Sequence, residues 1–455
     1  SEQMSARRFF QPVGQAEIGE HPHPTAPWRF DQAVVRPAPA PRLGQDPDPR
    51  FEGGPPPTAA TGTSPRRGAL AGLRVVDFTW AVAGPTASMI LASLGAEVIK
   101  VESRLRLDVL RRSPDTSATV NRLKKGVTLN LRHPKAVELA RSLVASSDVV
   151  TESFRPGVMD SLGLGYADLS AVKDDLVMLS SSMAGQHGPQ SRFAGYASMF
   201  VALSGLGDMT GYADGPPSQI LVGGDVIVGI HGAFSVIAAL LHRQRTGQGL
   251  HIDLSAIESQ SCLIGDSLLD FAVNGSVQRR AGNDEPGAAP HNCYKCRGDD
   301  RWVAIAVTSE VEWASFVAAI GSPPWASEGR FATGDARYAH RRDLDELVAS
   351  WTSDRSPAEV TGILQEAGVA AIPSYPAAEL FSDPHVADHQ MLVRAIGDGG
   401  VEVPLVRLGG RLSVTPLSAD RAGPALGEHN DEVFQGLLGL SPEQIDALTA
   451  EGVFT

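Results

Sequence analysis

The stretch "LAGLRVVDFTWAVAGPTASMILASLGAEVIKVE" at residues 70–102 decides the fold class. Within it, "LRVVDF" (73–78) and "EVIKVE" (97–102) are short apolar runs that indicate buried strands. Between them, "GPTASMILASLGA" (84–96) has the apolar spacing of a helix and ends at a glycine. A strand, a helix and a strand within about 30 residues predict a parallel βαβ unit.

The same alternation continues along the chain. The next predicted elements are strands at 127–131, 148–153 and 176–182 and a helix at 134–146. "GQGLHIDLS" (247–255) is a turn followed by a strand or by the start of a helix. This order predicts an α/β fold with a doubly wound, Rossmann-like large domain. The first loop, "TWAVAGPTAS", is not a GxGxxG loop, so a nicotinamide dinucleotide is not indicated.

A chain of 455 residues exceeds the size of one compact core, so we expect more than one domain. The strands and helices expected after about residue 257 are shorter than those before it and favour a smaller α+β domain. The predicted division is a Pro/Gly-rich N-terminal extension (1–70), a large α/β domain (71–256), a linker (257–281), the small α+β domain (282–380), and a linker with a C-terminal part that returns to the large domain (381–455).

The N-terminal extension has a composition that favours extended or mobile chain over a packed core. One detail complicates this interpretation. "PAPRLGQDPDPRF" (39–51) resembles "AGPALGEHNDEVF" (422–434). The match is either chance or the tail of a second, lost copy of the same domain, left by a tandem fusion or a split chain.

Composition excludes several classes of protein. The hydrophobic share of 42% and the charged share of 20% are those of an ordinary globular protein. A formal net charge of −13 argues against nucleic-acid binding, although it allows a local basic pocket. Three cysteines form no disulfide framework, which favours the reducing cytoplasm. The N-terminus lacks a signal pattern, and the longest apolar run (226–241) is short for a span, so no membrane segment is predicted.

One acidic residue stands out in "LVGGDVIVGIHG" (221–232). Asp225 follows two glycines and opens a long apolar segment, where an unpaired carboxylate is rarely buried. It is either a helix N-cap or a nucleophile held at the positive end of a helix, and the two roles are compatible.

Other chemistry-bearing residues are ambiguous. "CYKC" (293–296) lacks the second pair that zinc needs, so we expect a structural role, and we expect His231 to be a packing residue. No metal site is predicted. Lys124 and Lys125 precede a strand and form either a solvated charged loop or a phosphate clamp with the arginines of the preceding loop: Arg104, Arg106, Arg111 and Arg112.

Several segments together resemble the class III coenzyme A transferases, the CaiB/BaiF family. They are 70–102, "ESFRPGVMDSLGLGYADL" (152–169), the stretch 211–249 around Asp225, "DPHVADHQMLV" (383–393) and "PALGEHNDEV" (424–433). The resemblance covers about 70–455. It implies transfer of CoA between carboxylic acids, with acyl-CoA as co-substrate and no metal, in an interlocked dimer of two chains.

The resemblance assigns the family's nucleophilic aspartate to Asp225. Its carboxylate would form a mixed anhydride with the acyl group and then an aspartyl-CoA thioester. The neighbouring Gly223 and Gly224 would let the thioester approach the backbone. The resemblance also implies contacts with CoA or substrate for Ala81, Val82, Ala83 (pantetheine), Arg104, Lys124, Lys125 (phosphates), Phe154 (adenine) and Tyr196 (substrate).

The sequence departs from the family pattern at several sites. Val82 replaces an assisting glutamine, and "NDEPGAAP" (283–290) replaces the glycine-run loop of formyl-CoA transferases. Tyr196 and Ala197 stand where the racemase branch has a catalytic His and Asp. The alternatives to CoA transfer are therefore a racemase, lyase or hydrolase on the same scaffold, or a non-catalytic CoA-binding subunit. The expected partners are acyl-CoA, a small carboxylic acid, and a second chain, either identical or homologous.

Overall fold

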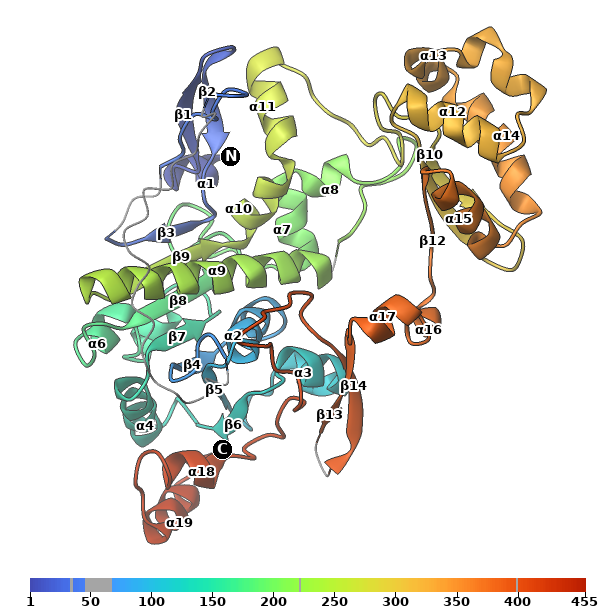
Figure 1. Ribbon diagram of the computed structural model, residues 1–455. Helices are drawn as coiled ribbons and strands as arrows, with labels where there is room; N and C mark the ends of the chain where they lie inside the picture. The colour runs from blue at the N-terminus through green and yellow to red at the C-terminus, as the bar shows by residue number, and fades with distance from the viewer. Residues whose placement is uncertain (33–35, 46–67, 221, 398–399) are drawn as a thin grey trace. The chain divides into compact units, whose positions relative to one another are not determined.

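The computed structural model describes residues 1–32, 36–45, 68–220, 222–397 and 400–455 (Figure 1). The segment 46–51 of the noted internal match lies outside them. The chain divides into two compact units. Unit 1 comprises Ser1–Gly207, Gln219–Gln278 and Gln390–Thr455, and unit 2 comprises Asp208–Ser218 and Arg279–His389.

Unit 1 is built on a seven-stranded sheet in the described part of the chain. Its strand order is β3 (Trp28–Phe30), β9 (Leu250–Ser255), β8 (Val177–Ser182), β7 (Val149–Glu152), β4 (Arg74–Phe78), β5 (Glu97–Glu102) and β6 (Lys125–Thr128). Every neighbouring pair is parallel except the antiparallel pair of β3 with β9. The predicted mixed α/β fold with a large parallel sheet is confirmed, and "LHIDLS" is a strand.

Both faces of this sheet are covered, which is why its strands are almost continuously apolar. On β4, Val75 faces the core under α2 (Ala83–Ser93) and α9 (Val222–Thr246), whereas Val76 faces the opposite core. That second core is closed by α4 (Pro134–Ala145) and by the end of the chain, through α18 (Asn430–Phe434) and Phe454 (Figure 1). The C-terminal residues thus complete the layer that α4 begins.

Helix α9 is longer than the apolar run within it. By length and composition alone, Gly223–Thr246 is one helix that could cross a membrane, a feature that the apolar run of 226–241 did not predict. In unit 1 it packs against α2, β8 and β9. Three of its large apolar side chains remain exposed: Ile230, Phe234 and Leu241.

The first 32 residues differ from the extended or mobile chain that their composition predicted. They form α1 (Glu2–Ala6), the hairpin of β1 (Phe10–Gln15) and β2 (Gly19–Pro24), and β3 at the edge of the main sheet. Met4 and Phe9 are buried in the core of unit 1. Composition missed this because the partners of these residues lie far along the chain.

Residues 257–281 were expected to be a linker, yet their first part is helical. The helices are α10 (Ala256–Ser261) and α11 (Gly265–Asn274), joined by a short 3-10 turn, and the side chains of α10 are buried. The buried polar side chains of α10 are stabilised because they have hydrogen-bond or ion-pair partners. Glu258 pairs with Arg7, and Gln260 Nε2 donates to the carbonyl of Gly224 at 2.9 Å.

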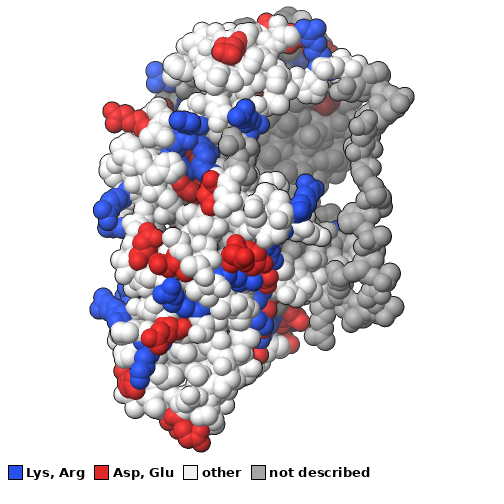
Figure 2. Space-filling model, turned by 90° about the vertical axis from the view of Figure 1, so that its left-hand side faces the viewer, with Lys and Arg blue, Asp and Glu red and all other residues white. Residues whose placement is uncertain are grey.

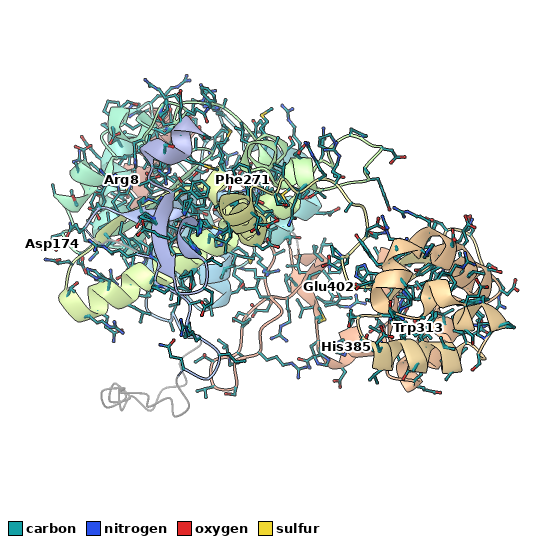
Figure 3. All side chains as sticks on the ribbon, turned by 90° about the horizontal axis from the view of Figure 1, so that it is seen from above. Arg8, Asp174, Phe271, Trp313, His385 and Glu402 are labelled. Carbon is teal, nitrogen blue, oxygen red and sulfur yellow. The ribbon has the colours of Figure 1, made fainter. Side chains whose placement is uncertain are left out.

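Unit 2 has a three-stranded antiparallel sheet of β10 (His291–Lys295), β11 (Trp302–Ala306) and β12 (Ala370–Pro373). Its core includes Trp313 (Figure 3) and the inward faces of α12 (Glu310–Ala319), α14 (Arg341–Ser353) and α15 (Pro357–Glu366). Cys293 lies on β10 and is exposed, whereas Cys296 is buried just beyond the strand, and both thiols are free.

The other elements are α3 (Pro114–Val120), α5 (Val158–Ser161), α6 (Tyr166–Ser170), α7 (Ala197–Ser204), α8 (Leu206–Met209), α13 (Gly334–Ala339), α16 (Ala377–Leu380), α17 (Pro384–Asp388), β13 (Leu392–Ile396), β14 (Glu402–Val406) and α19 (Pro442–Ala450). On the face drawn in Figure 2, basic and acidic side chains are interspersed.

Candidate active site

A cavity of about 710 Å³ opens at the carboxyl ends of the parallel strands in unit 1. Trp80, which follows β4, and Ser153, which follows β7, both line it. These two strands are neighbours, and the chain leaves them in opposite directions, β4 toward β5 and β7 toward β8. Ligands bind to such sheets at this point, because the loops diverge there and leave a crevice.

Asp225 lies in the first turn of α9 and lines this cavity. The preceding residue must be small. A Cβ on Gly224 would stand 3.0 Å from Val201 Cγ2 and 3.3 Å from the Phe200 ring on α7. The Gln260 amide holds the Gly224 carbonyl from the other side. The start of α9 is thereby fixed, and the carboxylate of Asp225 is presented to the cavity.

The electrostatic setting of Asp225 is that of a reactive carboxylate. Within the described residues, its side chain has no hydrogen-bond or ionic partner, and burial alone raises its pKa to about 6. It therefore does not cap α9, which begins three residues earlier at Val222. At neutral pH most of the population is ionised, partly desolvated and close to the positive end of a helix.

Part of the loop after β4, which was predicted to contact pantetheine, forms one wall of the cavity. Ala81 and Ala83 line the cavity, whereas Val82 turns away into a small apolar cluster with Leu110 and Val120. Ala81 has a positive φ of 58°, and its backbone N–H donates to Asp108 Oδ1 at 3.3 Å. The prediction that Val82 lines the pantetheine site is therefore not supported.

Lys124 does not take the predicted role of phosphate ligand. Its side chain is 0% exposed, and its Nζ donates to Asp77 Oδ2, to the Pro85 carbonyl and to Asn121 Oδ1, each at 3.0 Å. Burial lowers its pKa to about 8, against the pull of Asp77. The ammonium joins β4 to the first turn of α2 inside the protein.

Lys125 is also engaged elsewhere. It forms ion pairs with Glu97 and Glu432 and lines neither of the two cavities described here. Lys124 is thus buried inside the protein, whereas Lys125 is partly exposed and held by two glutamates outside both cavities.

Phe154, for which the resemblance implies a contact with the adenine, belongs to the wall of the site. It lines the cavity, and its ring meets Trp80 edge to face with centroids 6.3 Å apart. The buried Glu152, whose pKa burial raises to about 7, accepts a hydrogen bond from the Phe154 N–H at 2.8 Å. This bond fixes the start of the loop that lines the cavity.

Of the predicted phosphate contacts in the loop after β5, Arg106 lines the cavity and Arg104 does not. Arg104 is exposed and donates to the Leu426 carbonyl, whereas the Arg106 guanidinium lies 4.7 Å from the centre of the Trp80 ring. Arg106 and Trp80 also border a second cavity of about 240 Å³, which contains Arg132. The two cavities therefore share a wall that is formed by the Arg106 guanidinium and the Trp80 ring. Sequence reasoning named Arg106 only as one of four loop arginines and missed Arg132.

Tyr196 lines the large cavity and is 67% exposed, just before α7. Gly223 does not line it.

His231 packs against Trp28, with ring centroids 5.9 Å apart, in agreement with the expected packing role. The described residues contain no group of three or more potential metal ligands. Sequence reasoning missed Arg155 and several serines of the cavity wall: Ser153, Ser181, Ser182 and Ser191.

Together these features define an α/β protein whose candidate active site combines a partly buried carboxylate with aromatic and cationic walls. A family model described as "CoA-transferase family III" matches residues 70–430. The chain belongs to this family, and it is a class III CoA-transferase by that match and by its relatives.

Two of the relatives from Chloroflexus aurantiacus illustrate the similarity. Its succinyl-CoA–D-citramalate CoA-transferase is 35% identical over 84% of this chain and 97% of its own length. The beta subunit of its succinyl-CoA–L-malate CoA-transferase is 34% identical over 84% of this chain and 98% of its own length. A CaiB/BaiF family protein from Brucella suis has a similar structure, with a TM-score of 0.76 and 30% identity over 82% of this chain and all of its own.

Proposed function

We propose that this protein transfers CoA from an acyl-CoA to a carboxylic acid and that Asp225 is the nucleophile. The observation that carries the proposal is the unpartnered Asp225 carboxylate facing a cavity of about 710 Å³. A carboxylate is the nucleophile that this exchange needs, because it forms an anhydride that a thiolate can reopen.

The steps balance without any other reactant. An Asp225 oxygen attacks the thioester carbonyl, the C–S bond breaks, and a mixed anhydride and CoA thiolate result. The thiolate attacks the aspartyl carbonyl and releases the first acid as a carboxylate. The acceptor carboxylate attacks the aspartyl thioester, and the thiolate then takes the acyl group from the new anhydride, which restores the Asp225 carboxylate. In this proposal, backbone N–H groups at the start of α9 stabilise the developing oxyanions.

The two adjoining cavities support a bound CoA. In this proposal the pantetheine arm runs between Ala81 and Phe154 in the large cavity, and the nucleotide lies in the small one. Arg106 and Arg132 then face the phosphates. The strand order supports the finer, Rossmann-like classification, because numbering β4 to β9 as 1 to 6 gives 3-2-1-4-5-6.

The acyl donor is proposed to be succinyl-CoA. Both Chloroflexus relatives carry this donor in their names. Arg155 lines the cavity that contains Asp225 and offers a cation to a second carboxylate on the acyl group.

A second chain is part of the proposal, in an interlocked dimer. Ile230, Phe234 and Leu241 form an exposed apolar stripe along α9, which favours burial by another polypeptide. One relative is named as a beta subunit, so a homologous partner is the alternative to an identical one. We expect Phe234→Glu to lower the molecular mass in light scattering. An unchanged mass would contradict the use of this stripe.

Intact-mass analysis after incubation with succinyl-CoA, with hydroxylamine trapping, tests the mechanism. We expect a hydroxamate on Asp225 and no transfer to dicarboxylic acceptors by Asp225→Asn. The matched control is Asp266→Asn, which changes an exposed aspartate in the first turn of α11 and should retain activity. Full activity of Asp225→Asn would overturn the mechanism. Exchange of an α-proton with deuterated water, without CoA transfer, would favour a racemase.

A further inference from the structure

The N-terminal segment has the same local structure as a segment near the C-terminus. Shifting the numbering by 382 residues places α1 (Glu2–Ala6) on α17 (Pro384–Asp388). The same shift aligns the two hairpins in register, since the pair Phe10–Pro24 of β1 and β2 becomes the pair Leu392–Val406 of β13 and β14.

The two segments also share features that similar helices and hairpins need not have: a helix cap, a left-handed residue and a hydrogen bond after the hairpin. Each helix has a capping side chain at the equivalent place, since Ser1 accepts from Met4 N–H and Asp383 from Val386 N–H. Arg8 (Figure 3) and Gln390 both have a left-handed backbone, with φ of 52° and 48°. The same hydrogen bond follows each hairpin at 2.8 Å, from Thr25 N–H to the Phe9 carbonyl and from Arg407 N–H to the Met391 carbonyl.

The correspondence continues into the noted sequence match, now shifted by 383 residues. Gly44 and Gly427 have φ of 73° and 76°. The side chain of Gln45 accepts from Arg42 N–H at 2.9 Å, and that of Glu428 accepts from Ala425 N–H at 2.8 Å. Residues 1–25 and 42–45 therefore form a second copy of the backbone at 383–407 and 425–428, whereas the residues equivalent to β3, 410–412, form no strand.

This N-terminal copy contacts the loop 184–190, which leads into the wall of the candidate active site. Gln3 is 2% exposed, and its Nε2 donates to the carbonyls of Ala184 and His187 at 2.6 and 2.7 Å. Its Oε1 accepts from Gln190 N–H at 2.7 Å. One side chain thus uses both ends of its amide to hold the loop 184–190.

Two glycines in the loop 184–190 allow Gln3 and Arg7 to pack directly against its backbone. A Cβ on Gly188 would stand 2.5 Å from Gln3 Oε1, and a Cβ on Gly185 would stand 2.0 Å from Arg7 Nη1. Both glycines have positive φ, so the backbone approaches the N-terminal segment where another residue could not.

Arg7 holds the same loop indirectly. It is buried between Asp253, at 2.5 Å, and Glu258, at 2.7 Å. Asp253 in turn accepts from Gln186 N–H at 2.8 Å and pairs with His187 at 3.0 Å. The N-terminal copy therefore completes a buried ionic network whose other end is the loop backbone.

The loop continues directly into the wall of the candidate active site, because Ser191 and the residues 193–196 line the cavity together with Asp225. We propose that residues 1–32 act as a clamp on this wall, with Gln3 and Arg7 as positioning residues for transfer. The inference rests on the proposed function. It concerns a segment that lies before residue 70, where the family match begins.

The clamp belongs to the N-terminal copy alone. At the positions equivalent to Gln3 and Arg7, the C-terminal copy has His385 and His389, which are exposed and lie with their ring centroids 3.9 Å apart. The two copies thus share a backbone but not the contacting side chains.

Gln3→Ala in the full chain tests the clamp, with His385→Ala as the matched control in the other copy. We expect amide hydrogen exchange across 184–196 to rise about tenfold or more in Gln3→Ala. We also expect the KM for acyl-CoA to rise about fivefold or more, with the melting temperature within a few degrees of wild type. His385→Ala should leave exchange and KM unchanged.

Gln3→Glu is a second variant of equal size, in which a carboxylate would face two carbonyls, so the same loop should loosen. The clamp is overturned if exchange at 184–196 stays at the wild-type rate in both variants, or if it rises equally throughout unit 1. The exchange result decides the clamp even if wild type transfers no CoA, in which case the proposed function alone fails.

Discussion

Replacing Asp225 by asparagine should stabilise the protein at neutral pH while abolishing transfer. Burial raises the pKa of Asp225 from 3.8 to about 6, so ionising it in the folded state costs free energy. Each pKa unit corresponds to about 1.4 kcal/mol, so the shift sets an upper limit of about 3 kcal/mol. Solvent screening of a partly exposed group reduces this to about 1–2 kcal/mol.

The sign follows from proton binding. Between about pH 4 and pH 6 the folded chain keeps the Asp225 proton while the unfolded chain has lost it, so stability falls as pH rises. Above about pH 6, Asp225 is ionised in the folded chain, and the full free-energy cost of ionising it there lowers the stability. Asparagine does not ionise, so the variant avoids the cost and should match wild type only near pH 4.

The assay is thermal or urea unfolding of wild type and Asp225→Asn from pH 4 to pH 8, with Asp266→Asn as control. The gain of Asp225→Asn should grow with pH and level off above pH 7, at a few degrees in melting temperature. The pH profile of kcat/KM should rise through about pH 6, because Asp225 must be ionised to act as the proposed nucleophile. A variant that is equally stable at every pH, or whose advantage grows as pH falls, would refute the reasoning.

Three other substitutions, two of them paired with a control variant, distinguish residues that line the site from residues that support it. Arg106→Ala should raise the KM for acyl-CoA about tenfold, equivalent to about 1.4 kcal/mol, whereas Arg104→Ala should change it little, since only Arg106 lines the cavities. Lys124→Met should lower the melting temperature, because it removes the ion-pair partner of the buried Asp77 carboxylate, a loss that costs up to about 3–5 kcal/mol. Gly224→Ala should reduce kcat about tenfold, because its Cβ would stand 3.0 Å from a neighbouring side chain, whereas Gly223→Ala, at 3.4 Å, should be nearly silent.

Steady-state kinetics and thermal unfolding check all three. Equal KM values for the two arginine variants would contradict the placement of the cation. A stable Lys124→Met protein with selectively weakened CoA binding would restore the phosphate role of that lysine. Equal activity of the two glycine variants would show that close packing at the start of α9 does not position Asp225.

Much of the fold follows from local patterns. Residues 73–102 predict a βαβ unit because strand and helix periodicity depend on neighbours a few positions apart. The two glycines before Asp225 predict the start of a helix that carries an acid in its first turn. The resemblance of the surrounding segments to the family then singles out that acid as the expected nucleophile. The same patterns do not say which side of the sheet a basic residue faces, so Lys124 was assigned to a phosphate that it does not reach.

By itself, the sequence determined the parallel α/β class, the family and the one acid in an apolar segment, since these depend on residue type and short spacing. Only the tertiary structure decided that Lys124 is buried against Asp77, that Arg106 stacks at the junction of two cavities, and that residues 1–32 fold. The physical reason is separation along the chain. Gln3 meets Ala184 across 181 residues, and pairings over such distances leave no local periodicity.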